Sequence, residues 1–260
     1  MNIDKAKRIA VDSVKKAGDI LIDNLNEEKK LYYKDTKNTR DFTTEIDLKS
    51  ENIIVNAIKE LFPDHGFVSE EMGKENETKE FVWVLDPIDG TLNYSKGLPL
   101  FSIGLCLLQN QKPILGMNFD PITKNFYFAE KGKGATLNNK KISVSNCDDL
   151  NKAMLISHIS STEEKRRWLL ENLNEIYNRV LQIRFLGVAH NSQSFIAAGQ
   201  ADVFFEISTF PWDILPCTLI IEEAGGKVTE INGDPITLES STILATNGKL
   251  HDEMLKLLAT

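Results

Sequence analysis

The sequence predicts an α+β protein, because two amphipathic helix patterns open the chain and several antiparallel hairpin patterns follow. The first helix is expected at residues 3–25 and the second at residues 47–61, where apolar side chains recur on one face. Turn residues between apolar runs indicate hairpins at 110–112 and 138–139. Strand and helix patterns then alternate, which favours a smaller α/β half with a mixed sheet.

The chain has 260 residues, enough for one large domain or for two smaller ones that share a core. A polar stretch at residues 146–152 is the candidate boundary. We therefore expect an N-terminal α+β half at residues 1–146 and a C-terminal α/β half at residues 147–260. The elements expected in the second half are strands at 154–159, 180–185, 201–207 and around 243–245, and helices at 162–177, 188–199 and 213–224.

Between the first two helices lies a polar stretch, residues 26–40, which is expected to be a loop or a hairpin. We interpret its Lys34, Lys37 and Arg40 as solvated, with the alternative that one of them steers a phosphate. After the second helix, residues 67–69 are predicted to form a short strand, and the polar residues 72–80 a loop.

Composition limits the classes of partner. The formal net charge of −8 argues against a nucleic acid as the main partner, since nucleic-acid binding needs a basic surface. The widely spaced Cys106, Cys147 and Cys217 lack metal-binding or redox spacing and are expected to be free thiols in a reducing compartment. With no signal-peptide pattern and no apolar run long enough to span a membrane, we expect a cytoplasmic protein without a membrane partner.

The most informative stretch is Trp-Val-Leu-Asp-Pro-Ile-Asp-Gly-Thr-Leu-Asn-Tyr, at residues 83–94. An apolar run at 81–85 predicts a buried strand that ends at Asp86, because Pro87 removes a hydrogen-bond donor and restricts the residue before it. A tight Asp-Gly turn follows. Hard cations such as Mg²⁺ prefer oxygen ligands, and Asp86, the carbonyl of Ile88 and Asp89 offer three.

Gly90 and Thr91 are placed to begin a helix, whose first N–H groups would face an anion. A metal beside a helix N-terminus is a plausible phosphate site. The alternative is a solvated Asp-Gly turn, which is the commoner meaning of Asp-Pro-x-Asp-Gly taken alone.

The full twelve residues closely resemble the signature of the inositol monophosphatase family, which comprises lithium-sensitive, magnesium-dependent phosphatases. This family also includes fructose bisphosphatases and nucleotide bisphosphate phosphatases. Trp212-Asp213, followed by Glu-Glu-Ala-Gly-Gly at 222–226, resembles the family's second signature, and Asp-x-x-Thr-x-x-Asp at 41–47 resembles a third element. The resemblance spans nearly the whole chain and implies a layered αβαβα sandwich.

The resemblance implies a site that binds two or three Mg²⁺ ions. It assigns to Asp47 and Thr91 the orientation of an attacking water, while Glu70 serves as a metal-bridging catalytic residue and Glu206 contacts sugar hydroxyls. It also implies that Gly90 and Thr91 hold phosphate oxygens and that Asp89 and Asp213 adjoin the substrate. The implied metal ligands are Glu70, Asp86, the Ile88 carbonyl, Asp89 and Asp213.

Each of these residues also has a plain structural interpretation. Asp47 and Asp213 stand where helix N-caps are expected, and Asp41 is expected to shape its loop. Glu70 and its neighbour Glu71 could form an exposed acidic turn, and Glu206 could be a surface acid at a strand end. No Ser-His-Asp pattern is visible, since His158 and His190 have no acidic partner nearby in sequence.

The implied activity is hydrolysis of a small phosphorylated polyol or sugar, foremost inositol 1-phosphate, by a metal-activated water. The chain departs from the family pattern at Val188 and His190, where small residues are common. Fructose 1,6-bisphosphate, NADP and 3′-phosphoadenosine 5′-phosphate therefore remain alternative substrates. A regulatory binding protein of the same fold is the non-enzyme alternative, and a homodimer is expected because the family is often dimeric. A carbohydrate kinase is disfavoured, because no nucleotide-phosphate motif is present.

Overall fold

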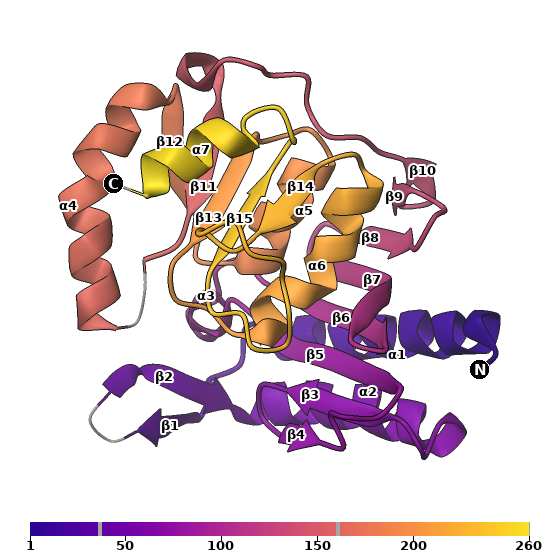
Figure 1. Ribbon diagram of the computed structural model, residues 1–260. Helices are drawn as coiled ribbons and strands as arrows, with labels where there is room; N and C mark the ends of the chain where they lie inside the picture. The colour runs from indigo at the N-terminus through magenta and orange to yellow at the C-terminus, as the bar shows by residue number, and fades with distance from the viewer. Residues whose placement is uncertain (36–37, 160–161, 260) are drawn as a thin grey trace.

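The computed structural model describes residues 1–35, 38–159 and 162–259, without the side chains of residues 35–41. Five layers follow one another through the described molecule (Figure 1). Helices α1 (Ile3–Asp23) and α2 (Glu45–Leu61) cover one sheet. Helices α5 (Ala189–Ala197) and α6 (Pro211–Glu223) lie between that sheet and a second one. Helices α4 (Glu163–Arg179) and α7 (His251–Leu258) cover the outer face of the second sheet, which completes the predicted αβαβα arrangement.

Within the described residues, the first sheet has eight strands in the order β10-β9-β8-β7-β6-β5-β3-β4 and is antiparallel except where β3 pairs with β5. The second sheet has the order β12-β11-β13-β15-β14 and is mixed. A separate hairpin joins β1 (Leu31–Asp35) and β2 (Asn38–Thr44). The remaining elements are β3 (Gly66–Ser69), β4 (Gly73–Glu75), β5 (Phe81–Asp89), α3 (Thr91–Ser95), β6 (Ser102–Gln109), β7 (Lys112–Asp120), β8 (Asn125–Glu130), β9 (Ala135–Leu137), β10 (Lys140–Lys141), a 3₁₀ turn (Leu150–Lys152), β11 (Met154–Ser157), β12 (Gln182–Phe185), β13 (Val203–Glu206), β14 (Lys227–Thr229) and β15 (Ile243–Thr246).

Strand β5 is buried on both faces, which explains its continuous apolar sequence. Trp83 and Leu85 pack in the cluster that contains α1 and α2. Val82 and Val84, on the opposite face, pack with Leu215 of α6. Because successive side chains alternate between the faces of a sheet, this strand is fixed on both sides and holds its C-terminal end in one place.

Both predicted hairpins are present. Asn110 and Gln111 connect β6 to β7 with φ angles of 48° and 62°. Asn138 and Asn139 connect β9 to β10 with φ angles of 49° and 64°. Positive φ at both central residues is the geometry of type I′ hairpin turns, and asparagine tolerates it better than most residues do.

The structure corrects several predicted boundaries. Asp47 is not an N-cap: helix α2 begins at Glu45, Thr44 is its N-cap, and Asp47 is its third residue. Asp213 likewise is the third residue of α6. The predicted loop at 72–80 contains strand β4, which extends the first sheet through antiparallel pairing with β3.

Along the chain, the last strand of the first sheet ends at Lys141 and the first strand of the second sheet begins at Met154. The division into two halves at residue 146 stays a prediction. The side chains of Lys37, Arg40 and Asp41 lie outside the described residues. Among the helices that the structure describes, none combines the length and apolar character needed to cross a membrane.

Candidate active site

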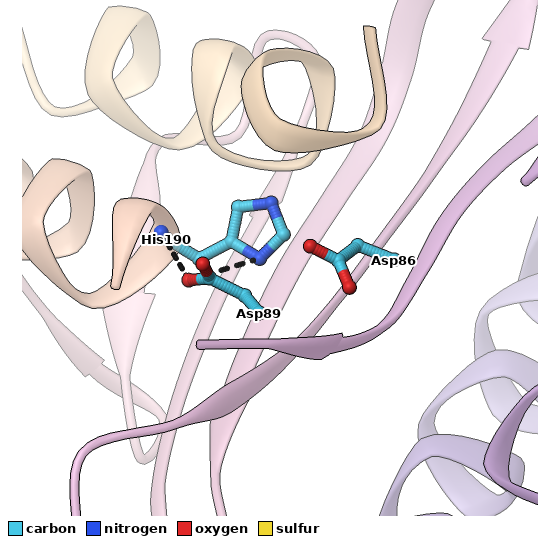
Figure 2. A group of neighbouring side chains, drawn as sticks. All are labelled: Asp86, Asp89 and His190. Carbon is cyan, nitrogen blue, oxygen red and sulfur yellow. Dashed lines mark hydrogen bonds and ion pairs between the residues drawn. The ribbon is translucent and has the colours of Figure 1, made fainter. Parts of the chain in front are cut away.

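The end of β5 carries an irregularity that places two carboxylates on one side. Asp86 pairs with Gly104 of β6, whereas Asp89 pairs with Ser102, so β5 contains one extra residue between the two pairs. In a regular strand, residues three apart point to opposite faces; the inserted residue cancels that alternation. The Ile88 N–H then donates to Asp86 Oδ1 over 3.0 Å. The side chains of Asp86 and Asp89 consequently lie beside each other (Figure 2).

Asp89 also attaches helix α5 to the first sheet. Its Oδ1 accepts the Ala189 N–H over 2.8 Å, and its Oδ2 accepts the His190 N–H over 2.6 Å. Ser102 donates a further hydrogen bond to Oδ2 over 3.3 Å. A carboxylate at a helix N-terminus is stabilised by the free N–H groups there and by the helix dipole.

Gly90 makes the turn after Asp89 possible. Its φ is 87°, and a Cβ at this position would lie 2.9 Å from the Leu100 carbonyl oxygen and 3.2 Å from that of Gly187. Both its conformation and its surroundings therefore require glycine. Helix α3 begins at the next residue, Thr91, as the sequence predicts, and extends only to Ser95.

Asp47 and Thr91 meet although 44 residues separate them in the chain. Asp47 is fully buried, and its Oδ2 accepts hydrogen bonds from the N–H and the hydroxyl of Thr44, over 2.8 Å and 2.5 Å. Its Oδ1 lies 3.1 Å from Thr91 Oγ1, which also lies 2.8 Å from the Ile88 carbonyl oxygen. Burial raises the pKa of Asp47 to about 6, against hydrogen bonds from Thr44 that lower it.

Asp213 is held in a similar way at the start of α6. Its Oδ2 accepts the Phe210 N–H over 2.8 Å and the Thr209 hydroxyl over 3.0 Å. Burial raises the pKa of Asp213 to about 7, and the nearby charges of Glu206 and Asp89 contribute to that rise. The capping interaction therefore fixes one carboxylate oxygen and sets the direction of the other.

Glu70 follows β3, and its N–H donates to the Leu85 carbonyl over 3.3 Å, which continues the pairing with β5. Lys34, from the β1–β2 hairpin, places its Nζ 2.9 Å from Glu70 and 3.0 Å from Glu71. Lys34 is exposed, as the sequence predicts, but its ammonium also pairs with two carboxylates, which the sequence does not indicate. The Glu71 side chain is only 5% exposed, so Glu70 and Glu71 do not form an exposed acidic turn.

The acidic groups raise one another's pKa. Burial raises the pKa of Asp86 well above its usual range, and the charges of Glu70, Asp89 and Asp213 add to that rise. Burial also raises the pKa of Glu70 to about 8, although the Lys34 ammonium opposes the change. Ionised together, these carboxylates repel one another in a poorly solvated place, and divalent cations would remove that repulsion. The donor set, carboxylates with the Ile88 carbonyl, fits a hard cation such as Mg²⁺.

Glu206 ends β13 and is 8% exposed, so it is not a surface acid. Its Oε2 lies 3.5 Å from Nδ1 of His158, which follows β11. Burial lowers the pKa of His158, but the Glu206 charge outweighs it and raises that pKa to about 9. This pair is not visible in the sequence because it depends on the register of two strands: Ser157 of β11 pairs with Phe205 of β13, so the residues that follow them are neighbours.

The sequence likewise indicates no role for His190. Its side chain is fully buried, with Nδ1 3.6 Å from Asp89 Oδ2, and its ring lies next to the two aspartates (Figure 2). Asp86, Asp89 and His190 each offer one ligand atom, and these three atoms lie within 4.8 Å of one another. The only signal in the sequence was a large residue at a position where the family commonly has a small one.

The fold, together with the carboxylates of Glu70, Asp86, Asp89 and Asp213 (the acidic cluster), defines a class of protein. Comparison with known proteins identifies that class: the chain belongs to the inositol monophosphatase family, whose model matches residues 2–260. The chain is 32% identical over 252 residues to Nus factor SuhB of Xylella fastidiosa, covering 94% of this chain and 91% of the relative. It is 31% identical over 251 residues to human inositol monophosphatase 1, covering 94% and 90%. The solved structure of an IMPase from Thermotoga maritima superposes with a TM-score of 0.89 at 30% identity, covering 98% of this chain and 97% of that one.

The family is one of Mg²⁺-dependent phosphatases, and the sequence resemblance to it is thereby confirmed. The names of the relatives nevertheless divide between inositol monophosphatases and SuhB proteins, so membership of the family leaves the substrate open.

Proposed function

We propose that the protein is a Mg²⁺-dependent phosphomonoesterase that hydrolyses a small phosphorylated polyol or sugar, foremost inositol 1-phosphate. One observation supports this proposal above all: Asp86 and Asp89 of β5 are buried side by side, and Asp213 at the start of α6 is near enough for its charge to raise the pKa of Asp86. Thr91, which follows directly after this end of β5, is hydrogen-bonded to Asp47. Glu70, Asp86, Asp89, Asp213 and the Ile88 carbonyl would hold two or three Mg²⁺ ions. When bound, Mg²⁺ lowers the pKa of water and neutralises charge on a phosphate.

Thr91 and Asp47 would orient the attacking water and receive its proton. Thr91 Oγ1 lies between the Ile88 carbonyl and Asp47 Oδ1, so the hydroxyl can pass a hydrogen bond from a water to the carboxylate. Asp47 cannot turn away, because Thr44 binds its other oxygen twice. Burial raises the pKa of Asp47 to about 6, which makes this carboxylate a better proton acceptor than an ordinary aspartate.

The phosphate would rest on the N–H groups of Gly90 and Thr91, at the first turn of α3. Glu206 would bind the hydroxyl groups of the alcohol part, and Asp213 would lie next to the ester oxygen. The His158 ring keeps Glu206 in place and balances its charge, which leaves the carboxylate able to accept hydrogen bonds from a polyol.

One feature supports inositol 1-phosphate as the first substrate to test. Glu206 is an acceptor of the kind that a ring of hydroxyl groups requires. Val188 and His190, the two departures from the family pattern, are both buried and keep the alternative substrates open. Fructose 1,6-bisphosphate, NADP and 3′-phosphoadenosine 5′-phosphate are the competing substrates for the same chemistry.

The test is a phosphate-release panel over these four compounds, with and without Mg²⁺ and with and without Li⁺. We expect Mg²⁺-dependent turnover that is highest for inositol 1-phosphate and is inhibited by Li⁺. Asp86→Asn should be inactive, whereas Asp120→Asn, which changes a buried strand-end aspartate of β7 outside the cluster, should retain turnover. No phosphate release from any compound would refute the proposal, and a different preferred compound would refute the substrate assignment alone.

A second candidate is a regulatory binding protein, favoured by the relatives named Nus factor SuhB. The net charge of −8 disfavours direct contact with nucleic acid. The version of this candidate to test is therefore a protein that binds other proteins. Two results together would favour this candidate. The wild-type protein would show negligible turnover in its host, and the inactive Asp86→Asn protein would still bind cellular proteins specifically.

We also propose a homodimer in the cytoplasm. The homodimer rests on the resemblance to the family, and the three cysteines, which lie in described parts of the chain and are all free, are consistent with a reducing compartment. Light scattering of the purified protein measures the mass and tests the dimer directly.

A further inference from the structure

The imidazole of His190 occupies a slot that the neighbouring strand leaves open. His190 is the second residue of α5, and its side chain is fully buried. Gly104 of β6 lies directly opposite, and a Cβ atom at residue 104 would overlap the ring. A glycine in the interior of a strand costs stability and often marks a close approach. Here it admits a ring next to Asp86, with which Gly104 pairs across the sheet.

One nitrogen of the ring has a defined protonation. His190 Nε2 lies 2.9 Å from the Trp212 carbonyl oxygen. A carbonyl can only accept, so Nε2 carries a hydrogen and donates it. In the neutral ring Nδ1 therefore presents a lone pair. Metal-binding histidines commonly donate their other N–H to a carbonyl or carboxylate in this way, which fixes the ring and its tautomer.

Nδ1 itself is buried and, among the described residues, has no hydrogen-bond partner. It points toward the acidic cluster (Figure 2), 3.6 Å from Asp89 Oδ2, which is too long for a hydrogen bond. Nδ1 and one oxygen from each of Asp86 and Asp89 lie within 4.8 Å of one another. A lone pair facing two carboxylates is unfavourable unless a cation lies between them, and a buried polar atom without a partner requires an explanation.

We propose that His190 Nδ1 is a metal ligand and forms, with Asp86 and Asp89, a site of mixed nitrogen and oxygen donors. The inference rests on the proposed function only in that the acidic cluster must bind divalent cations. Oxygen donors suit Mg²⁺, whereas an imidazole favours transition metals such as Mn²⁺, Co²⁺ and Zn²⁺. The chain therefore selects transition metals at this position more strongly than a site built from oxygen alone.

Pulsed electron paramagnetic resonance with Mn²⁺ tests the proposal without measuring turnover. In wild-type protein labelled with ¹⁵N-histidine, we expect a hyperfine coupling between bound Mn²⁺ and one ¹⁵N nucleus. The coupling should disappear in His190→Ala and persist in His251→Gln, which removes an equally buried histidine whose two ring nitrogens bond Thr229 and Thr246. Mn²⁺ bound to the wild type with no ¹⁵N coupling overturns the proposal, even if His190→Ala does not fold.

Calorimetry supplies a second measurement. We expect His190→Ala to weaken Zn²⁺ binding by about tenfold or more while Mg²⁺ binding changes much less, because only the nitrogen donor is lost. Equal weakening of both metals overturns the inference. The two proposals fail differently: absence of any divalent binding in the wild type overturns the metal-dependent function and the histidine ligand together, whereas binding without nitrogen coupling overturns the ligand alone.

Discussion

Asp47 and Asp213 hold the same position in two different helices. Each is the third residue of its helix, and each turns back so that Oδ2 accepts the N–H of the N-cap residue over 2.8 Å. The interaction closes the helix N-terminus and fixes the carboxylate at the same time. Two helices from distant parts of the chain thus each hold an acid rigidly, and stabilise their own first turns in doing so; we propose that both acids serve the same site.

Asp47→Asn should separate these two roles. An asparagine oxygen can still accept the Thr44 N–H, but the amide cannot accept a proton through Thr91. We expect kcat to fall by about 10²–10⁴-fold with little change in KM. Steady-state phosphate release measures the loss, and Glu45→Gln, on the same helical turn, serves as the control. A kcat for Asp47→Asn close to that of the wild type would exclude Asp47 from proton transfer.

Asp86→Asn should stabilise the metal-free protein. The substitution removes a charge that is almost fully buried beside other carboxylates, and the amide oxygen of the new side chain can keep the hydrogen bond from the Ile88 N–H. We expect the Tm in a chelator to rise by a few degrees, and the stabilisation by added Mg²⁺ to shrink. Thermal unfolding with chelator and with Mg²⁺ measures both; a lower Tm in chelator would show that repulsion at Asp86 is unimportant.

The stability of the metal-free protein should fall as the pH rises. Asp47, Asp213 and Glu70 have folded-state pKa values of about 6, 7 and 8, above the value of about 4 for unfolded acids. Between these values the folded state binds more protons, so the free energy of unfolding decreases from about pH 4 to about pH 8. Mg²⁺ binds the ionised groups and should reverse the decrease at high pH.

Denaturant unfolding at several pH values, with chelator and with Mg²⁺, checks this expectation. The informative quantity is the difference between the two curves, because other titrating groups affect both. A difference that stays constant from about pH 5.5 to about pH 8.5 would contradict the pKa values above.

Lys34→Gln should tighten the binding of Mg²⁺. The Lys34 ammonium lies at hydrogen-bonding distance from Glu70 and Glu71, so it supplies positive charge that a metal would otherwise supply. We expect the Kd for Mg²⁺ to fall several-fold by calorimetry. Lys59→Gln removes a similar ion pair, with Glu75, away from the cluster and should leave the Kd unchanged. An increased Kd for Lys34→Gln would mean that Lys34 assists the metal site.

The sequence allows the local features of this protein to be predicted, because their causes are local. The apolar run at 81–85 becomes strand β5, Gly90 makes the predicted turn, and asparagine stands in both hairpin turns. The five layers followed from resemblance to the family, since nothing in periodicity alone specifies how the two sheets are stacked.

The features that escaped prediction depend on pairing between distant segments. The extra residue between Asp86 and Asp89 is visible only against the partner strand β6. His158 finds Glu206 because β11 and β13 run parallel in one register, and Lys34 reaches Glu70 because a hairpin turns back toward β3. Asp47 was expected as the N-cap of α2, but the N-cap lies three residues earlier, at Thr44, and Asp47 is the third residue of the helix, where it completes the capping box.

Asp89 contributes both to the attachment of helix α5 and to the acidic cluster. Its oxygens accept the first N–H groups of α5, and the same carboxylate belongs to the acidic cluster. Asparagine at residue 89 would turn an amide donor toward one of those N–H groups, so the variant is expected to lose helix attachment as well as chemistry. A mutational screen scored by protein abundance would therefore class residue 89 as a folding position, and only an assay of purified, correctly folded variants could test the chemical role that we propose for it.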